Sequence, residues 1–114
     1  MATSTQFKAN IEKIIGQTRA IKFKGDDFDL CVSLLTSEKE QEIYGWVKEV
    51  LANKIVPILT KTKEHSLLVF RKPLSLPNGR NRILLVKLKN SHYILFNMGS
   101  HDNYDRMSKE LNIR

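Results

Sequence analysis

Residues 66–98 read SLLVFRKPLSLPNGRNRILLVKLKNSHYILFNM, and the fold prediction rests mainly on this segment. It contains three runs rich in leucine, valine, isoleucine and aromatic residues, at positions 66–71, 80–89 and 93–98. Proline, asparagine, glycine and serine in the two intervening segments are typical of turns. The pattern therefore predicts a three-stranded antiparallel meander. The middle run, RILLVKL, is apolar through its centre, which is typical of a strand covered on both faces.

A long helix is predicted before the meander, at residues 37–54. It begins with Ser-Glu-Lys-Glu, in which Ser37 and Glu40 form a capping box that satisfies free backbone amides. Asn53 and Pro57 supply the stop signal at its other end. An apolar stripe at three- and four-residue spacing follows the cap and comprises Ile43, Trp46, Val47, Val50 and Leu51.

The remaining segments are shorter. An apolar face at helical spacing predicts an N-terminal helix capped by Ser4 or Thr5. Alternation in residues 21–24 and 28–34 around Gly-Asp-Asp predicts a hairpin, with a short helix at 28–35 as the alternative. A second apolar helical face predicts a C-terminal helix at 103–111.

These elements together predict an α+β domain. Its sheet is an antiparallel meander of three to four strands, packed against two or three helices. The 114 residues are expected to form a single domain, because domains of this length usually have one core. Its parts are the N-terminal helix and hairpin (1–35), the long helix (37–54), the meander (66–98) and the C-terminal helix (103–111).

The charge of the chain is unevenly distributed. Lysine and arginine number 19 against 12 acidic residues, a formal net charge of +7. Residues 1–57 hold eight basic and eight acidic residues, so the whole excess lies in residues 58–114. This balance indicates a polyanionic partner, and the alternative is a face that only keeps the protein soluble.

Several other classes are disfavoured. A single cysteine, Cys31, makes no internal disulfide, and it is expected to be a small buried hydrophobe. No apolar run suits a signal peptide or a transmembrane helix, so we expect a cytoplasmic location and no membrane partner. The chain has no glycine-rich phosphate loop and no zinc motif, and His65, His92 and His101 lack metal-ligand spacing. We therefore expect no cofactor and no metal.

Cations and proton-transfer groups gather in the last third of the chain. In an antiparallel meander the end of the first strand and the start of the second share an edge, to which the end of the third returns. Arginine binds phosphate through two parallel hydrogen bonds, histidine and tyrosine transfer protons, and the 2′-hydroxyl of RNA is a built-in nucleophile. The alternative is that Arg82 only lies along a sheet edge and Tyr104 only packs on the core. The predicted patch comprises Arg71, Lys72, Arg80, Arg82, His101, Tyr104 and Arg106.

Three segments carry a resemblance to a known family: NGRNRILLV at 78–86, YILFNMG at 93–99 and HDNYD at 101–105. They resemble the strand pair and closing motif of the RelE/ParE superfamily of toxins from type II toxin–antitoxin modules. The helix at 37–54 also fits the helix that precedes the sheet in that family.

The resemblance implies a RelE-like fold and an mRNA endonuclease that inhibits translation, often in the ribosomal decoding site, and that a cognate antitoxin neutralises. By position, Arg82 would be the transition-state arginine. His101 or Tyr104 would act as acid, base or stacking group, and Lys72 or Arg80 would contact phosphate.

Two other readings of the sequence remain open. The first is a non-catalytic basic module of phage or plasmid type that binds nucleic acid, the ribosome, a polymerase or gyrase. The second is a structural or assembly protein whose charge only solubilises it. Salt-dependent nucleic-acid binding without cleavage would favour the former, and negligible binding at low salt the latter.

Overall fold

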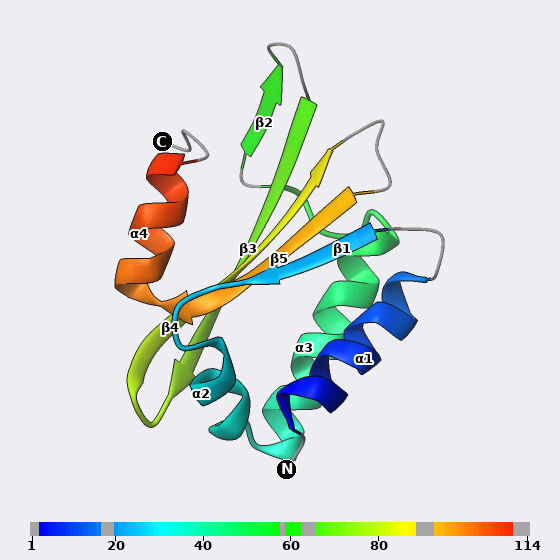
Figure 1. Ribbon diagram of the computed structural model, residues 1–114. Helices are drawn as coiled ribbons and strands as arrows, with labels where there is room; N and C mark the ends of the chain where they lie inside the picture. The colour runs from blue at the N-terminus through cyan, green and yellow to red at the C-terminus, as the bar shows by residue number, and fades with distance from the viewer. Residues whose placement is uncertain (1–2, 17–19, 58, 63–65, 89–92, 111–114) are drawn as a thin grey trace.

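The computed structural model describes residues 3–16, 20–57, 59–62, 66–88 and 93–110, although of residues 59–62, 66, 67, 88, 107, 108 and 110 only the backbone is described. The elements follow one another as α1 (Ser4–Ile15), β1 (Ala20–Lys24), α2 (Phe28–Ser33), α3 (Ser37–Leu51), β2 (Leu59–Thr62), β3 (Ser66–Leu76), β4 (Gly79–Leu88), β5 (Tyr93–Ser100) and α4 (His101–Glu110). Figure 1 shows their arrangement.

The sheet has five strands in the order β1-β5-β4-β3-β2. Strands β2 to β5 form an antiparallel meander, and β1 lies parallel to β5 at the edge. The α+β class and the central meander are thus confirmed. The purely antiparallel sheet is wrong, because β1 and β5 are joined by a long connection that includes α2 and α3, and a long connection permits parallel pairing.

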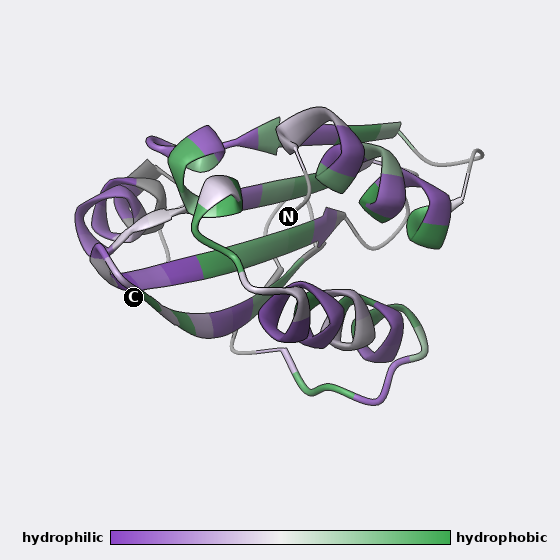
Figure 2. Cartoon of the chain, turned by 90° about the horizontal axis from the view of Figure 1, so that it is seen from below, coloured by the Kyte–Doolittle hydropathy of each residue, from purple (hydrophilic) through white to green (hydrophobic). Residues whose placement is uncertain are grey.

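Helices cover both faces of the sheet, but unequally. Helices α1, α2 and α3 lie on one side and α4 lies on the other (Figure 1). Ile83 and Leu85 of β4 point into the main core under the first three helices, whereas Leu84 and Val86 point into a smaller cluster on the α4 side. The prediction that the middle run of the meander is covered on both faces is therefore confirmed. Figure 2 shows hydrophobic colour along much of the strands and mixed colour around the helices.

The predicted hairpin is wrong, and its alternative, a short helix, is confirmed. Phe28, Cys31 and Val32 are buried in α2, and their spacing of three and four residues suits a helix better than a strand. Leu30, which the alternating pattern placed on the buried face, is 47% exposed. The turn before α2 is sharp because Asp27 adopts a left-handed conformation with φ of 60°.

Helix ends differ from the predictions by a few residues. The cap of α3 is Thr36, whose hydroxyl accepts from the Lys39 amide at 3.1 Å, so the Ser37 capping box is wrong by one position. The helix ends at Leu51 rather than residue 54, shortly before Asn53 with its φ of 60°. Likewise Thr3, not Ser4 or Thr5, caps α1.

Two strands also differ. Strand β2 was not predicted, because four residues carry little periodicity. Strand β3 continues past residue 71 through Pro73 to Leu76. Since β2 pairs with β3 only at residues 66–69, Pro73 lies on a free edge, where its missing amide proton breaks no ladder. The predicted ends at residues 89 and 111 lie outside the described residues.

Candidate functional site

Two arginines from neighbouring strands meet one tyrosine on the α4 side of the sheet. Arg71 of β3 donates from Nη1 to the Tyr104 hydroxyl at 3.0 Å. The guanidinium carbons of Arg71 and Arg82 lie 5.8 and 5.5 Å from the centre of the Tyr104 ring, within the range of cation–π contacts. We call Arg71, Arg82 and Tyr104 the arginine–tyrosine cluster.

The strand register explains why the two arginines meet. Arg71 lies opposite Leu84 and Arg82 lies opposite Pro73, so the arginines are diagonal neighbours on one face. Tyr104 is the fourth residue of α4, and its ring packs on the small apolar cluster that includes Leu84. The sequence prediction that Arg71, Arg82 and Tyr104 converge agrees with this geometry.

A chain of buried amides holds the start of α4 against the sheet. The Asp26 backbone amide donates to Asn103 Oδ1 at 3.1 Å, and Asn103 Nδ2 donates to Asn97 Oδ1 at 2.7 Å. Asn97 and Asn103 are only 1% and 4% exposed. Gly99 permits this close approach, because a Cβ there would lie 2.6 Å from the Asp26 carbonyl oxygen. The position of Tyr104 therefore depends on contacts between α4, β5 and the turn after β1.

His101 stands beside the cluster at the first position of α4. Its ring centre is 6.3 Å from that of Tyr104. Its Nδ1 lies 3.4 Å from Asp105 Oδ2, and the side chain is 52% exposed. With Nδ1 directed at this carboxylate, Nε2 is the ring nitrogen left for proton transfer.

Lys72 is not part of the cluster, although its place beside Arg71 in the sequence predicts that it is. Successive residues of a strand point to opposite faces, so Lys72 projects towards α3, where Nζ lies 3.0 Å from Glu42 Oε1. The hydrogen bond from Lys72 lowers the pKa of Glu42. The predicted phosphate contact of Lys72 therefore has no support from its position.

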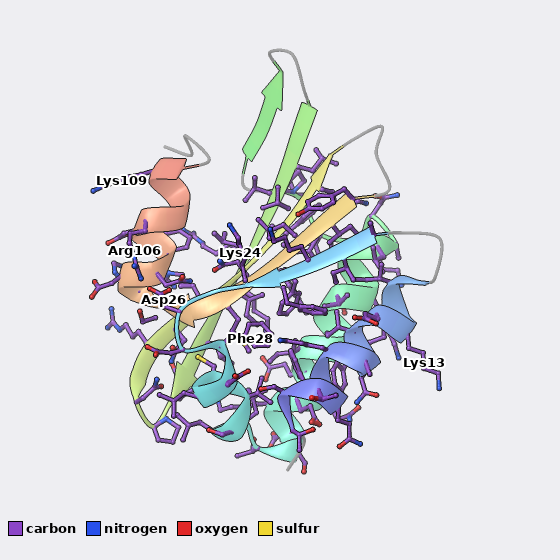
Figure 3. The ribbon with its side chains drawn as sticks, viewed as in Figure 1. Lys13, Lys24, Asp26, Phe28, Arg106 and Lys109 are labelled. Carbon is purple, nitrogen blue, oxygen red and sulfur yellow. The ribbon has the colours of Figure 1, made fainter. Side chains whose placement is uncertain are left out.

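The two other predicted cations, Arg80 and Arg106, lie outside the arginine–tyrosine cluster. Arg80 is exposed on β4 opposite Ser75, on the same face as Arg82 and nearer the turn. Arg106 pairs with Asp26 and so ties α4 to the turn after β1. Figure 3 shows the side chains of Arg106 and Asp26 facing each other.

Strand β1 adds cations to this face that are not among the predicted site residues. Ile21 and Phe23 pack against the main core, so the exposed Lys22 and Lys24 alternate onto the α4 side. Lys24 pairs in register with Asn97, and Figure 3 shows its side chain on that side of β1. The alternation Ile-Lys-Phe-Lys is visible in the sequence, but the pairing of β1 with β5 is not.

One group near the cluster has the residue types of a cation site. His101, Asp102 and Asp105 each offer one ligand atom, and these atoms lie within 4.8 Å of one another. All three are exposed on consecutive turns of α4, where acidic side chains are common. We assign no metal to them.

A hollow of about 430 Å³ lies away from the cluster, between α1, β1 and α2. The ammonium of Lys8 lies over the rings of Phe23 and Phe28, at 5.8 and 5.1 Å from their centres. Asp27 and Asp29 also line it, so together with Lys8 its charges are mixed. The groups that suit phosphate chemistry lie in the arginine–tyrosine cluster and not in this hollow.

Cys31 is buried in the core, as predicted, with 0% exposure. Burial, followed by the charge of Asp27, raises the pKa of its thiol to about 11. At pH 8 a thiol with the ordinary pKa of 9.0 is ionised to thiolate about 100-fold more than the Cys31 thiol of the folded protein. We expect iodoacetamide at pH 8 to alkylate Cys31 at least about 100-fold more slowly in the native protein than in urea. Rates within tenfold of each other would contradict the raised pKa.

Comparison of the chain with protein-family models, with curated proteins and with solved structures gives no significant match. Among the described residues, no helix has both the length and the apolar character needed to cross a membrane. The fold and site thus define an α+β protein with an arginine–tyrosine cluster on one face of a mixed sheet.

Proposed function

We propose that this protein is a RelE-like endoribonuclease toxin that cleaves mRNA and so inhibits translation. The observation that carries the proposal is the convergence of Arg71 and Arg82 on Tyr104, with His101 beside it. Two guanidinium groups and two proton-transfer groups are sufficient for metal-independent cleavage of RNA at a phosphodiester. The resemblance of residues 78–105 to the RelE/ParE motifs supports the same reaction.

In the proposed reaction the 2′-oxygen of one nucleotide attacks the adjacent phosphorus. The new O–P bond forms as the bond from phosphorus to the 5′-oxygen of the next nucleotide breaks. His101 Nε2 takes the proton of the 2′-hydroxyl, and Tyr104 gives its proton to the leaving 5′-oxygen. The products are a 2′,3′-cyclic phosphate and a free 5′-hydroxyl, and proton exchange with water restores both side chains.

The arginines stabilise the charges that this reaction creates. Arg82 binds the phosphate oxygens, whose negative charge grows in the transition state. Arg71 already donates to the Tyr104 hydroxyl, so it stabilises the phenolate that remains after the proton has left. The hydroxyl accepts this bond and keeps its own proton for donation to the leaving group.

The surroundings of the cluster suit single-stranded RNA. Arg80 lies exposed on the same face near the β3–β4 turn, and Lys22 and Lys24 of β1 lie across β5 from Val86 and Leu84 of β4. Cations spaced along a face bind the phosphates that flank a cleavage site, largely irrespective of sequence. On this proposal the partners are mRNA, on or off the ribosome, and an antitoxin whose acidic surface covers the cationic face.

Cleavage of a synthetic RNA tests the proposal. We expect single-stranded RNA to be cut to products with 2′,3′-cyclic phosphate ends, and a single 2′-deoxy substitution to abolish the cut at that nucleotide only. Primer extension on mRNA from cells that express the protein should show discrete new ends together with growth arrest. Salt-dependent RNA binding without any cut would contradict the proposal and favour a non-catalytic binding module.

Removal of metal ions gives a further prediction. Because the 2′-hydroxyl is the nucleophile and side chains move the protons, EDTA should leave the rate of cleavage within about twofold of the untreated rate. The measurement is the initial rate on the same RNA with EDTA and with added Mg²⁺ or Mn²⁺. A loss in EDTA that Mn²⁺ restores would contradict the proposed reaction and direct attention to His101, Asp102 and Asp105.

A further inference from the structure

Two buried side-chain donors on the α4 side of the sheet have no acceptor among the described residues. They are Nε of Arg82 and Nδ2 of Asn97. Asn97 is only 1% exposed. Buried polar groups in folded proteins are almost always hydrogen-bonded, and an unpaired donor costs free energy, so two neighbouring exceptions need an explanation.

The orientation of the Asn97 amide follows from its neighbours. The Asp26 backbone N–H can only donate, so the atom of Asn103 that accepts it must be Oδ1. The other end of the Asn103 amide is then Nδ2, which donates to Asn97. Asn97 must therefore present Oδ1 to Asn103, and its Nδ2 remains an unpaired donor.

The two donors lie on the same face of adjacent strands. Arg82 pairs in register with Gly99, and Asn97 pairs with Leu84, so Arg82 and Asn97 are diagonal neighbours across β4 and β5. Diagonal neighbours are within reach of a long side chain. The first turn of α4, whose backbone amides carry partial positive charge, adjoins Asn97 through Asn103. All these groups favour an oxygen that carries negative charge.

We propose that Asn97 Nδ2 and Arg82 Nε bind one oxyanion together, a non-bridging oxygen of a phosphate group. That this phosphate belongs to RNA rests on the proposed function, whereas the pair of donors does not. The Tyr104 ring covers the Arg82 guanidinium, so the phosphate reaches Nε as the ring moves aside. A charge-assisted hydrogen bond from arginine to phosphate is stronger than a cation–π contact, and it favours this exchange.

The test uses inorganic phosphate and NMR of the full chain. The Arg82 Nε–H signal and the two Asn97 side-chain amide signals should shift together and give one dissociation constant. Replacing Asn97 by leucine (N97L) removes the donor at nearly constant volume and should weaken phosphate binding at least fivefold. Asn81→Leu is the matched control, because Asn81 is 2% exposed on the opposite face of β4 and should leave binding within twofold.

A second variant keeps the test decisive if N97L does not fold. Asn97→Asp retains the oxygen that accepts from Asn103 and places a carboxylate beside Arg82 Nε, so it should fold and lose phosphate binding. Unchanged binding in either folded variant, or a shift at Arg82 without one at Asn97, would overturn the inference. Phosphate binding without RNA cleavage would leave the inference standing and refute only the proposed nuclease. If N97L cleaves RNA and binds phosphate as well as the wild-type protein does, the inference about Asn97 is refuted and the proposed nuclease stands.

Discussion

Replacing Arg82 and Tyr104 together by alanine should lower the rate of RNA cleavage by about 10³-fold or more. The double variant loses both the group that stabilises the transition state and the proton donor for the leaving oxygen. Losses of this size follow the removal of a single oxyanion donor or general acid from an enzyme, and residues that act together are not additive. The measurements are the cleavage rate on RNA and the growth of cells that express the variant.

The matched control for this loss is Lys72→Ala. It removes one positive charge, as the double variant does, but from the face of the sheet that meets α3. Its cleavage rate should stay within about threefold of the wild-type rate, because Lys72 contacts Glu42 of α3 and lies on the other side of the sheet from the cluster. Circular dichroism should show both proteins folded. Growth arrest by a folded double variant, or an equal loss in Lys72→Ala, would refute the assignment of the cluster.

Replacing Gly25 by alanine should lower the free energy of unfolding by about 3 kcal/mol or more. Gly25 follows β1 with a backbone φ of 132°, which side chains rarely tolerate. A Cβ at this position would also overlap the carbonyl oxygen of Met98 in β5, and backbone atoms cannot move aside cheaply. The change thus strains the turn that joins β1 to α2 and presses on the strand that carries Asn97.

Gly45 provides the contrasting substitution. It lies within α3, and a Cβ there meets no atom within 4 Å. Alanine at position 45 should therefore raise the free energy of unfolding by up to about 1 kcal/mol, because glycine is a poor helix former. Urea unfolding of both variants measures the two effects. Equal midpoints for the Gly25 variant and the wild type would contradict the close packing of the turn against β5.

Much of the fold follows from local pattern. The continuous apolar run of β4, the stripe on α3 and the turn residues between strands each predict an element without knowledge of its neighbours. The hairpin prediction failed because residues 28–34 satisfy both the strand and the helix period over a short length. Burial of Phe28, Cys31 and Val32 against α1 and β5 selects the helix.

Part of the candidate site can also be predicted from local pattern. That Arg71, Arg82, His101 and Tyr104 gather follows from an antiparallel meander and the helix after it, both of which are local. The prediction for Lys72 is wrong because it uses only the position of the residue at the strand end. Side chains alternate along a strand, so Arg71 and Lys72 point to opposite faces of the sheet. Asn97 was missed because a buried asparagine in an apolar strand gives no signal until its partners are known.

Local patterns in the sequence are enough to predict the β3–β5 meander, the helices α1, α3 and α4, and the excess of positive charge in the second half. The parallel pairing of β1 with β5, which brings Lys24 and Asp26 to Asn97 and α4, is visible only in the folded protein. The physical reason is the separation along the chain. Local periodicity records which side of an element is apolar, but the contact between Asp26 and Asn103 spans 77 residues and leaves no trace in either segment.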